Sequence, residues 1–212
     1  GKGQYGEGDI FLGLKVPEIR NIAKNYISLN FKYLEKLLSS KIHEHRLIAL
    51  LILVLKYNKS NVKEKKNIIG FYLKNTKKIN NWDLVDLSSH QILGNYLIGQ
   101  KDKSILYKLA KSDSLWEKRI SIVSTYAFIK KNKFKDTLKI SKILLEDKHD
   151  LIQKAVGWML REAGKRNQNV LEDFLKEYSK DMPRTMLRYS IERFDEGKRK
   201  YYLNRNKTVL NI

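Results

Sequence analysis

Residues 43–51, HEHRLIALL, open the first of five similar segments that recur along this chain. Successive segments start about 35 residues apart, which is within the range of stacked helical-hairpin repeats. The other four segments read NWDLVDLSS (81–89), LWEKRISIV (115–123), DLIQKAVGW (150–158) and PRTMLRYSI (183–191). An array of such helix pairs buries a core between neighbours and curves, so that equivalent helices line one concave face. A compact irregular helical bundle is the alternative.

Helical periodicity is nearly continuous between the two prolines, Pro17 and Pro183. Both suit the first turn of a helix, where the missing N–H costs little. No window of more than a few residues alternates as a strand does. The predicted helices cover residues 17–29, 31–39, 43–57, 61–75, 82–98, 103–111, 114–131, 135–146, 150–165, 168–180 and 184–195. The chain is therefore predicted to be all-α, and because no Pro-, Gly- or Ser-rich linker interrupts it, residues 1–212 are predicted to form a single domain.

The composition points to a polyanionic partner. The chain has 43 Lys and Arg against 23 Asp and Glu, a formal net charge of +20. Such a field attracts DNA, RNA or an anionic membrane surface. A lysine-rich, solvated surface without a polyanionic partner is the simpler alternative.

Several classes of protein are excluded or disfavoured. The chain has no cysteine, so disulfides, thiolate metal sites and cysteine nucleophiles are excluded. No signal peptide is visible, and the apolar run LIALLILVL (47–55) is far shorter than the roughly 20 residues of a membrane helix. This run is predicted to be a buried core helix. We expect a monomeric bacterial protein of the cytoplasm, associated with the nucleoid and not with a membrane, and the lack of an initial Met suggests a trimmed start.

The stretch NNWDLVD, residues 80–86, places Trp82 and Asp86 four residues apart. Residues at i and i+4 lie on one face of a helix. A carboxylate repels phosphate, so it is an unusual residue on a face that meets polyanions. One use that tolerates it is a site that stabilises positive charge developing on a nucleic-acid substrate. Asp83, in the first turn, is better explained by the favourable interaction of an acid with a helix N-terminus.

Trp82, Asp86, Arg119 and Trp158 fall near the starts of three consecutive second helices. Stacking these helices would place an indole and a carboxylate, then a guanidinium, then a second indole, along one groove wall. Each residue also has a plain interpretation: a helical tryptophan is more often core, Asp86 could pair with a neighbouring base, and Arg119 could be a solvated cation. Both interpretations stay open at this point.

Two further motifs are weaker signals. GKGQYG (1–6) matches GxGxxG, but no strand precedes it and no helix follows directly, so dinucleotide binding is rejected. His43 and His45 flank Glu44, but residues at i and i+2 point to different sides of a helix, and HExxH is absent. We therefore expect no metal site and no cofactor.

Six segments together resemble the AlkD-type DNA alkylation repair glycosylases, which are alkylpurine DNA glycosylases built from HEAT-like repeats. The segments are FLGLKVPEIR (11–20), SKIHEHR (40–46), NNWDLVD (80–86), LWEKR (115–119), KAVGWMLRE (154–162) and MPRTMLRY (182–189). The likeness implies an all-α, right-handed superhelical solenoid of HEAT-like antiparallel helix pairs with a basic concave face. Members usually carry further helical sequence before the FLG segment, so we expect the family's N-terminal helices to be missing or trimmed here.

The resemblance also carries the family's functional residues onto this chain. The motif aspartate falls on Asp86 and the two tryptophans on Trp82 and Trp158, which are the expected catalytic residues. The arginine of the family's W-x-x-R segment falls on Arg119. The expected DNA contacts are Arg46, Arg119, Lys154, Arg161, Arg184 and Arg188.

The implied activity is the release of N3- or N7-alkylated purines from double-stranded DNA by hydrolysis of the N-glycosidic bond. Alkylation makes the base cationic, so the remaining barrier is positive charge on the deoxyribose, as in glycosidases. A fixed carboxylate and indole faces can stabilise that charge. The family is associated with holding the lesion in the duplex, whereas glycosylases generally flip the base.

Two rival functions remain. One is a non-catalytic HEAT-repeat protein that binds DNA or RNA by shape, and the other is a scaffold for an acidic protein. The stretch that holds the acid at position 86 distinguishes the enzyme from both rivals. A phosphate binder gains nothing from the acid, and a scaffold does not need the tryptophan spacing. No lysine stands among the acid and the indoles to form a Schiff base, so the enzyme is predicted to be monofunctional.

Overall fold

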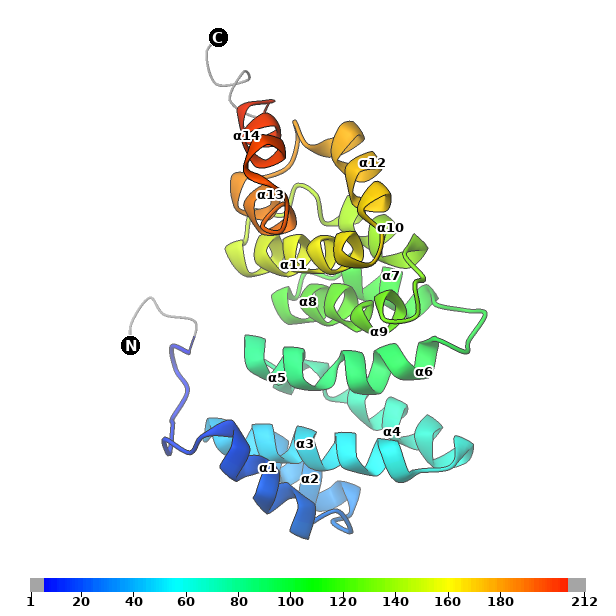
Figure 1. The fold of residues 1–212 in the computed structure, drawn as a ribbon. Coiled ribbons are helices and arrows are strands. Elements are labelled where there is room, and N and C mark those ends of the chain that lie inside the picture. Colours follow the sequence, from blue (N-terminus) through cyan, green and yellow to red (C-terminus); the bar gives the residue numbers. More distant parts are fainter. Residues whose placement is uncertain (1–5, 206–212) are drawn as a thin grey trace. The chain divides into compact units, whose positions relative to one another are not determined.

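The computed structural model describes residues 6–205, and within them it contains helices, turns and loops but no β-strand (Figure 1). The prediction of an all-α chain is confirmed. The chain divides into two compact units, Gly1–Gly99 and Gln100–Ile212. The single domain over residues 1–212 and the right-handed superhelical solenoid stay predictions.

The first unit is built around one long buried helix. Its elements are α1 (Val16–Asn25), α2 (Phe31–Leu38), α3 (His43–Lys59), α4 (Val62–Lys74), the 3-10 helix η1 (Thr76–Lys78), α5 (Trp82–Ser88), the π-helix η2 (His90–Gly94) and α6 (Asn95–Leu97). α1, α2, α4 and α5 all pack against α3. Burial on several sides explains why LIALLILVL lacks a polar face, and confirms that this run is a core helix.

The helix starts of this unit follow local sequence signals. Pro17 stands in the first turn of α1, as expected. The Asn30 side chain accepts a hydrogen bond from the Tyr33 N–H at the start of α2. Asn61 and Glu64 form a reciprocal capping box at the start of α4, which satisfies two backbone N–H groups that the helix leaves unpaired.

The predicted helix over residues 82–98 is interrupted. α5 ends at Ser88, and the π-helix η2 then connects it to α6. In the π turn the Gly94 N–H donates to the Ser89 carbonyl, five residues back, at 2.9 Å. A π turn inserts one residue without changing the direction of the chain, so the apolar pattern continues through it and hides it from sequence analysis.

The second unit is centred on α11. Its elements are α7 (Ser104–Ala110), α8 (Leu115–Ser124), α9 (Tyr126–Ile129), α10 (Lys135–Ile143), α11 (Asp150–Arg166), α12 (Gln168–Tyr178), α13 (Arg184–Ser190) and α14 (Glu196–Arg205). α11 packs against α8, α10, α12 and most extensively α13. The approach to α13 depends on Gly157, where an added Cβ would lie 2.5 Å from the Met186 carbonyl oxygen and from the Tyr189 Cβ.

α14 is the one long helix that the sequence pattern did not predict. Its sequence, EGKRKYYLNR, is polar, and Tyr202 is its only residue that is fully buried. A helix with one buried anchor shows no apolar stripe, which is the signal used to predict helices. In the part of the chain that the structure describes, no helix is both long and apolar enough to cross a membrane.

Candidate functional site

α5 carries the tryptophan and the carboxylate of the NNWDLVD stretch. Its N-cap is Asn81, whose side-chain carbonyl accepts the Trp82 N–H at 2.7 Å. The Trp82 side chain is 45 % exposed, and Asp86 is half-buried one turn later. Helix geometry places residues at this spacing on one face. The first unit thus presents an indole and a carboxylate together, as the spacing predicted.

Asp86 also influences the interior of the unit. Burial, and after it the charge of Asp86, raise the pKa of Tyr72 well above its usual value, against the opposing effect of the hydrogen bond with Ser88. Tyr72 therefore remains a neutral phenol, 3.0 Å from the Ser88 hydroxyl.

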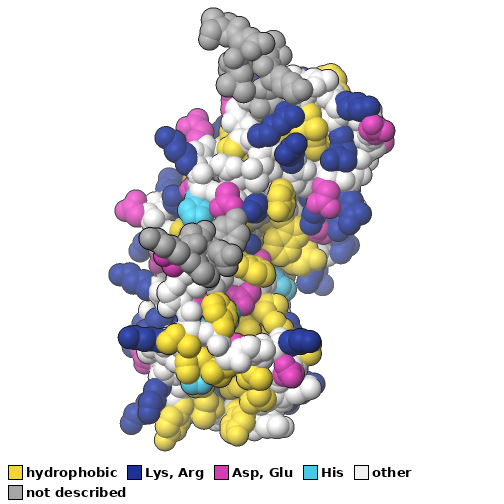
Figure 2. Space-filling model, turned by 90° about the vertical axis from the view of Figure 1, so that its left-hand side faces the viewer, with side chains coloured by type: hydrophobic (Ala, Val, Ile, Leu, Met, Phe, Trp, Pro, Cys, Tyr) yellow, Lys and Arg dark blue, Asp and Glu magenta, His cyan; other side chains and the backbone are white. Residues whose placement is uncertain are grey.

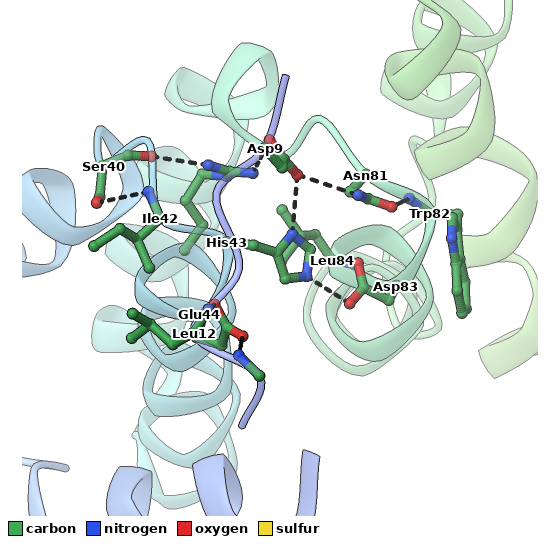
Figure 3. Close-up of polar contacts among 12 residues, drawn as sticks. Asp9, Leu12, Ser40, Ile42, His43, Glu44, Asn81, Trp82, Asp83 and Leu84 are labelled. Atoms are coloured by element: carbon green, nitrogen blue, oxygen red, sulfur yellow. Dashed lines mark hydrogen bonds and ion pairs between the residues drawn. The ribbon is translucent and has the colours of Figure 1, made fainter. Parts of the chain in front are cut away.

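A network of charged and polar side chains surrounds the start of α5 (Figure 3). His43, the first residue of α3, lies between two carboxylates: its Nε2 is 2.7 Å from Asp83 and its Nδ1 is 3.1 Å from Asp9. Asp9 is also 2.6 Å from the Arg46 guanidinium and accepts a hydrogen bond of 3.2 Å from the Asn81 amide. These five residues, the carboxylate–histidine network, come from three separate segments of the first unit.

Residues 9–13 form a strap that lies against the start of α3. The Ile10 carbonyl accepts the His43 N–H at 2.8 Å, and the Glu44 carboxylate accepts the N–H groups of Leu12 and Gly13, both at 2.9 Å. Gly13 has a φ of +84°, a conformation that favours glycine. The strap therefore reaches α3 through backbone hydrogen bonds as well as through Asp9.

The carboxylate–histidine network was not predicted from the sequence. Asp83 does stand in the first turn of α5, as expected, but it also accepts from His43. His43 and its partners lie 34 and 40 positions apart in the chain, so no local motif links them. The one available signal was a histidine at the start of a helix with an apolar interior.

In the second unit, α11 presents the other predicted tryptophan. Trp158 is half-buried, and its indole ring centre is 5.9 Å from the ring centre of Tyr126, at an interplanar angle of 41°. The Lys130 ammonium lies 4.4 Å from the centre of the Tyr126 ring, within the range of a cation–π contact. Trp158 thus belongs to an aromatic pair with a cation beside it.

Arg119 is buried at the start of α8. Its side chain donates a hydrogen bond of 2.6 Å to the Leu151 carbonyl, in the first turn of α11. This bond ties α8 to α11 and satisfies a backbone acceptor. Arg119 is therefore not the solvated cation of the plain interpretation.

The six side chains predicted to contact DNA differ in their exposure and in whether they already bind partners inside the protein. Arg46 and Arg119 are buried, and both bind acceptors inside their own unit. Partly buried basic side chains with partners are Lys154 (Asp150), Arg161 (Glu192 and Glu162) and Arg184 (the Leu203 carbonyl). Arg188 is exposed. As DNA contacts all six stay predictions, and exposure favours Arg188.

The surface does not present one block of positive charge on the face drawn in Figure 2. Lys and Arg side chains are scattered there, and acidic and apolar side chains lie between them. Hydrophobic side chains gather in the lower part of this view, and the exposed apolar residues of the first unit include Phe11, Leu12, Tyr26 and Tyr33. A basic concave face stays a prediction.

The predicted site residues belong to two units. Trp82 and Asp86 lie in the first unit, and Arg119 and Trp158 in the second. That the four act on one groove stays a prediction. Among residues 6–205, no group of three or more His, Asp or Glu side chains is arranged to hold a metal ion.

The helical fold has a counterpart among solved proteins. The fold is similar to that of a solved protein described as a predicted DNA alkylation repair enzyme from Enterococcus faecalis, with a TM-score of 0.68. The two share 16 % sequence identity, over 89 % of this chain and 90 % of the other, so this likeness concerns the fold alone. Comparison with curated proteins gives no match. A family model described as DNA alkylation repair enzyme matches residues 2–194, a span that includes α5 with Trp82 and Asp86 as well as α11 with Trp158. The chain belongs to the DNA alkylation repair enzyme family.

Proposed function

We propose that this protein is a monofunctional DNA glycosylase that releases N3- or N7-alkylated purines from double-stranded DNA. The observation that carries the proposal is the exposed Trp82 indole one helical turn from the Asp86 carboxylate, at the start of a helix whose Asn81 cap accepts the Trp82 N–H and whose Asp83 bonds to His43. Membership of the DNA alkylation repair enzyme family supports it, since alkylated DNA is the substrate that the family name specifies.

The reaction needs little acid catalysis. An alkyl group on N3 or N7 makes the purine cationic, so it leaves as a neutral base when it takes the electron pair of the N-glycosidic bond. A water oxygen forms the new bond to C1′ of the deoxyribose, and its proton passes to Asp86 or to solvent. The barrier therefore lies in the positive charge that builds on the sugar, as in oxocarbenium-like transition states.

Asp86 is assigned to stabilise that charge. A carboxylate fixed near the sugar acts in the transition state more than in the ground state, and one such group typically contributes a factor of about 100–1000 in rate. It can also orient the attacking water. Trp82 and Trp158 are assigned to the faces of the cationic nucleotide, where each indole contributes about 0.5–2 kcal/mol.

DNA binding is assigned to the net charge of +20 and to basic side chains of both units, organised as a right-handed superhelical solenoid of HEAT-like helix pairs. Arg188 is assigned a direct phosphate contact because it is exposed. Arg46 and Arg119 are assigned a positioning role, because their guanidinium groups already bind acceptors inside the protein. The lesion stays in the duplex in this proposal.

The test compares the parent protein with Asp86→Asn in single-turnover release of labelled 7-methylguanine from a defined duplex. The amide keeps the size of the side chain and deletes its charge, so the rate should drop by about 100- to 1000-fold while DNA affinity holds or improves. Asp113→Asn is the matched control, because Asp113 is exposed in a loop, and it should keep the parent rate.

Asp83→Asn is not a neutral control, because Asp83 bonds to His43. Equal rates for the parent and Asp86→Asn would refute the assignment of Asp86. If the parent binds methylated duplex but releases no base, the protein is a non-catalytic helical-repeat DNA binder.

A further inference from the structure

We propose that Asp9 and His43 are positioning residues that hold Trp82 and Asp86 in place through Asn81 and Asp83, and that this hold requires a protonated His43. The inference rests on the proposed function, because it concerns the same α5 helix. It assigns a role to the N-terminal strap and to a buried histidine that do not themselves touch the substrate in the proposed reaction.

The first link runs from Asp9 to Trp82. The Asn81 amide nitrogen donates to Asp9 at 3.2 Å, while the Asn81 side-chain oxygen accepts the Trp82 N–H at 2.7 Å. A carboxylate can only accept hydrogen bonds, so Asp9 selects the orientation in which Asn81 turns its NH₂ group toward the strap. That orientation leaves the amide oxygen for Trp82. Asp9 thereby fixes the cap on which α5 begins.

The second link runs through His43. Its two ring nitrogens face carboxylates, Asp9 at 3.1 Å and Asp83 at 2.7 Å. Only the imidazolium form has two N–H donors, so both hydrogen bonds exist together only when His43 is protonated. After loss of a proton, one ring nitrogen would present a lone pair to a carboxylate. One of the two contacts must then weaken, and either loss loosens the start of α5.

The surroundings of His43 favour the protonated form. Burial lowers the pKa of His43, but the hydrogen bonds and charges of Asp83 and then Asp9 outweigh burial, so that its pKa is raised above 6.5. The strap residue Phe11 covers the imidazole, with the ring centres 4.8 Å apart. The charged groups in contact with the ring are Asp9 from the strap and Asp83 from α5. Two further charged groups of α3 lie nearby: Arg46, which is paired with Asp9, and Glu44, whose charge interacts with that of His43.

α5 depends on such external support. The first N–H groups of a helix have no acceptor within it, and the polar side chains at this end of α5, Asn81 and Asp83, are bonded to Asp9 and His43. The Trp82 indole points away from His43 in Figure 3, so the network supports the helix from the side opposite the proposed substrate. A small displacement of α5 would move the indole and Asp86 together, and a misplacement of about 1 Å can cost about 100-fold in rate.

The experiment has one arm that needs no catalytic activity. The full-length protein is labelled with 5-fluorotryptophan, and its ¹⁹F spectrum is followed from pH 6 to pH 9, with the Trp82 signal assigned through Trp82→Phe. The Trp82 signal should shift with a single midpoint above 6.5 in the parent. The shift should vanish in His43→Gln and persist in His45→Gln. His45 is the matched control, since it lies on the same helix and bonds to the Ser40 hydroxyl instead of a carboxylate.

The second arm measures 7-methylguanine release over the same pH range. The parent rate should fall as pH rises through the ¹⁹F midpoint. His43→Gln and Asp9→Asn should be slower than the parent at pH 6.5 by about 10- to 100-fold and should lose the fall. His45→Gln should follow the parent.

A Trp82 signal of the parent that does not titrate overturns the inference, and this result needs no variant that might misfold. An unchanged pH profile in His43→Gln overturns it as well. If no protein releases base, the proposed function fails, but the ¹⁹F titration still decides whether His43 controls the position of Trp82.

Discussion

The start of α5 in the first unit is surrounded by four ionisable side chains, whereas the middle of α11 in the second unit lies directly against the backbone of α13. The four are Asp9, His43, Arg46 and Asp83. At α11 the close contact is possible because Gly157 has no side chain, and a Cβ there would collide with Met186 and Tyr189 of α13. Both helices carry a tryptophan of the proposed site.

The two tryptophan-bearing helices are therefore held by forces that respond to different changes. Ion pairs and charged hydrogen bonds depend on protonation and on every partner being present, because a buried charge without its partner is costly. Close packing depends on volume and shape, and is insensitive to pH. Substitutions that remove a charge should therefore mainly destabilise the first unit, and substitutions that add volume should mainly destabilise the second.

The largest stability effect should follow from deleting a buried charge in the first unit. Arg46→Met leaves Asp9 without its guanidinium partner, and breaking a buried ion pair costs about 3–5 kcal/mol of unfolding free energy. Arg119→Met is the matched change in the second unit, where the Leu151 carbonyl loses a hydrogen-bond donor, at a cost of about 1–3 kcal/mol. Urea denaturation, followed by hydrogen exchange in each unit, measures both. Equal costs would contradict the comparison.

A change of volume should be felt next. Gly157→Ala places a methyl group where the α13 backbone and the Tyr189 Cβ would be 2.5 Å away, so the helices must separate. Overpacking of this kind costs about 1–3 kcal/mol. The same substitution at Gly70, in α4, meets no atom within 4 Å and should stabilise the protein by about 0.5–1 kcal/mol. Thermal unfolding of the two variants gives the signs, and a stable Gly157→Ala would refute the close-packing argument.

The sequence predicted what depends on short-range pattern. The spacing of Trp82 and Asp86 follows from one helical turn, and the burial of residues 47–55 follows from an apolar run, so both were visible in the chain. The network around His43 was not, because it joins residues 34 and 40 positions apart that share no periodicity. The same holds for Arg119, since arginine is usually exposed and only the structure shows the Leu151 carbonyl beside it.

Stability of the first unit should fall as pH rises through the pKa of His43, and none of the pKa shifts resolved among the described residues of the second unit belongs to a histidine. The folded pKa of His43 is raised, so its contribution is complete below its ordinary value of 6.5 and is lost as pH rises through the folded value. The pKa values of Asp9 and Glu44 are lowered by their hydrogen bonds despite burial. Their contributions are therefore present above the ordinary values of 3.8 and 4.5 and are lost as pH falls through the folded values.

Hydrogen exchange at pH 6 and pH 8, corrected for the intrinsic rates, measures this effect in each unit separately. Backbone and Cβ contacts such as those at Gly157 do not titrate, so protection in the middle of α11, away from the His149 cap of its first turn, should change less than protection of α3 and α5. A loss of protection at pH 8 that is larger in α11 than in α3 and α5 would contradict the prediction that His43 controls the pH dependence.

The smallest effect should come from the exposed Arg188, and it concerns binding instead of stability. If about six phosphates are engaged, affinity for DNA should fall by roughly 1000-fold between 50 and 200 mM salt. Arg188→Ala should lower the slope of log affinity against log salt by about one, for methylated and plain duplex alike, because a phosphate contact carries no information about the base.

Lys59→Ala is the control: Lys59 is exposed at the last residue of α3, about 25 Å along the helix from His43. It should leave the slope unchanged if the DNA lies near the helix starts that carry the site. Loss of affinity confined to methylated DNA in Arg188→Ala would instead assign this residue to the lesion, and a parent protein with no salt dependence would remove the phosphate contacts altogether.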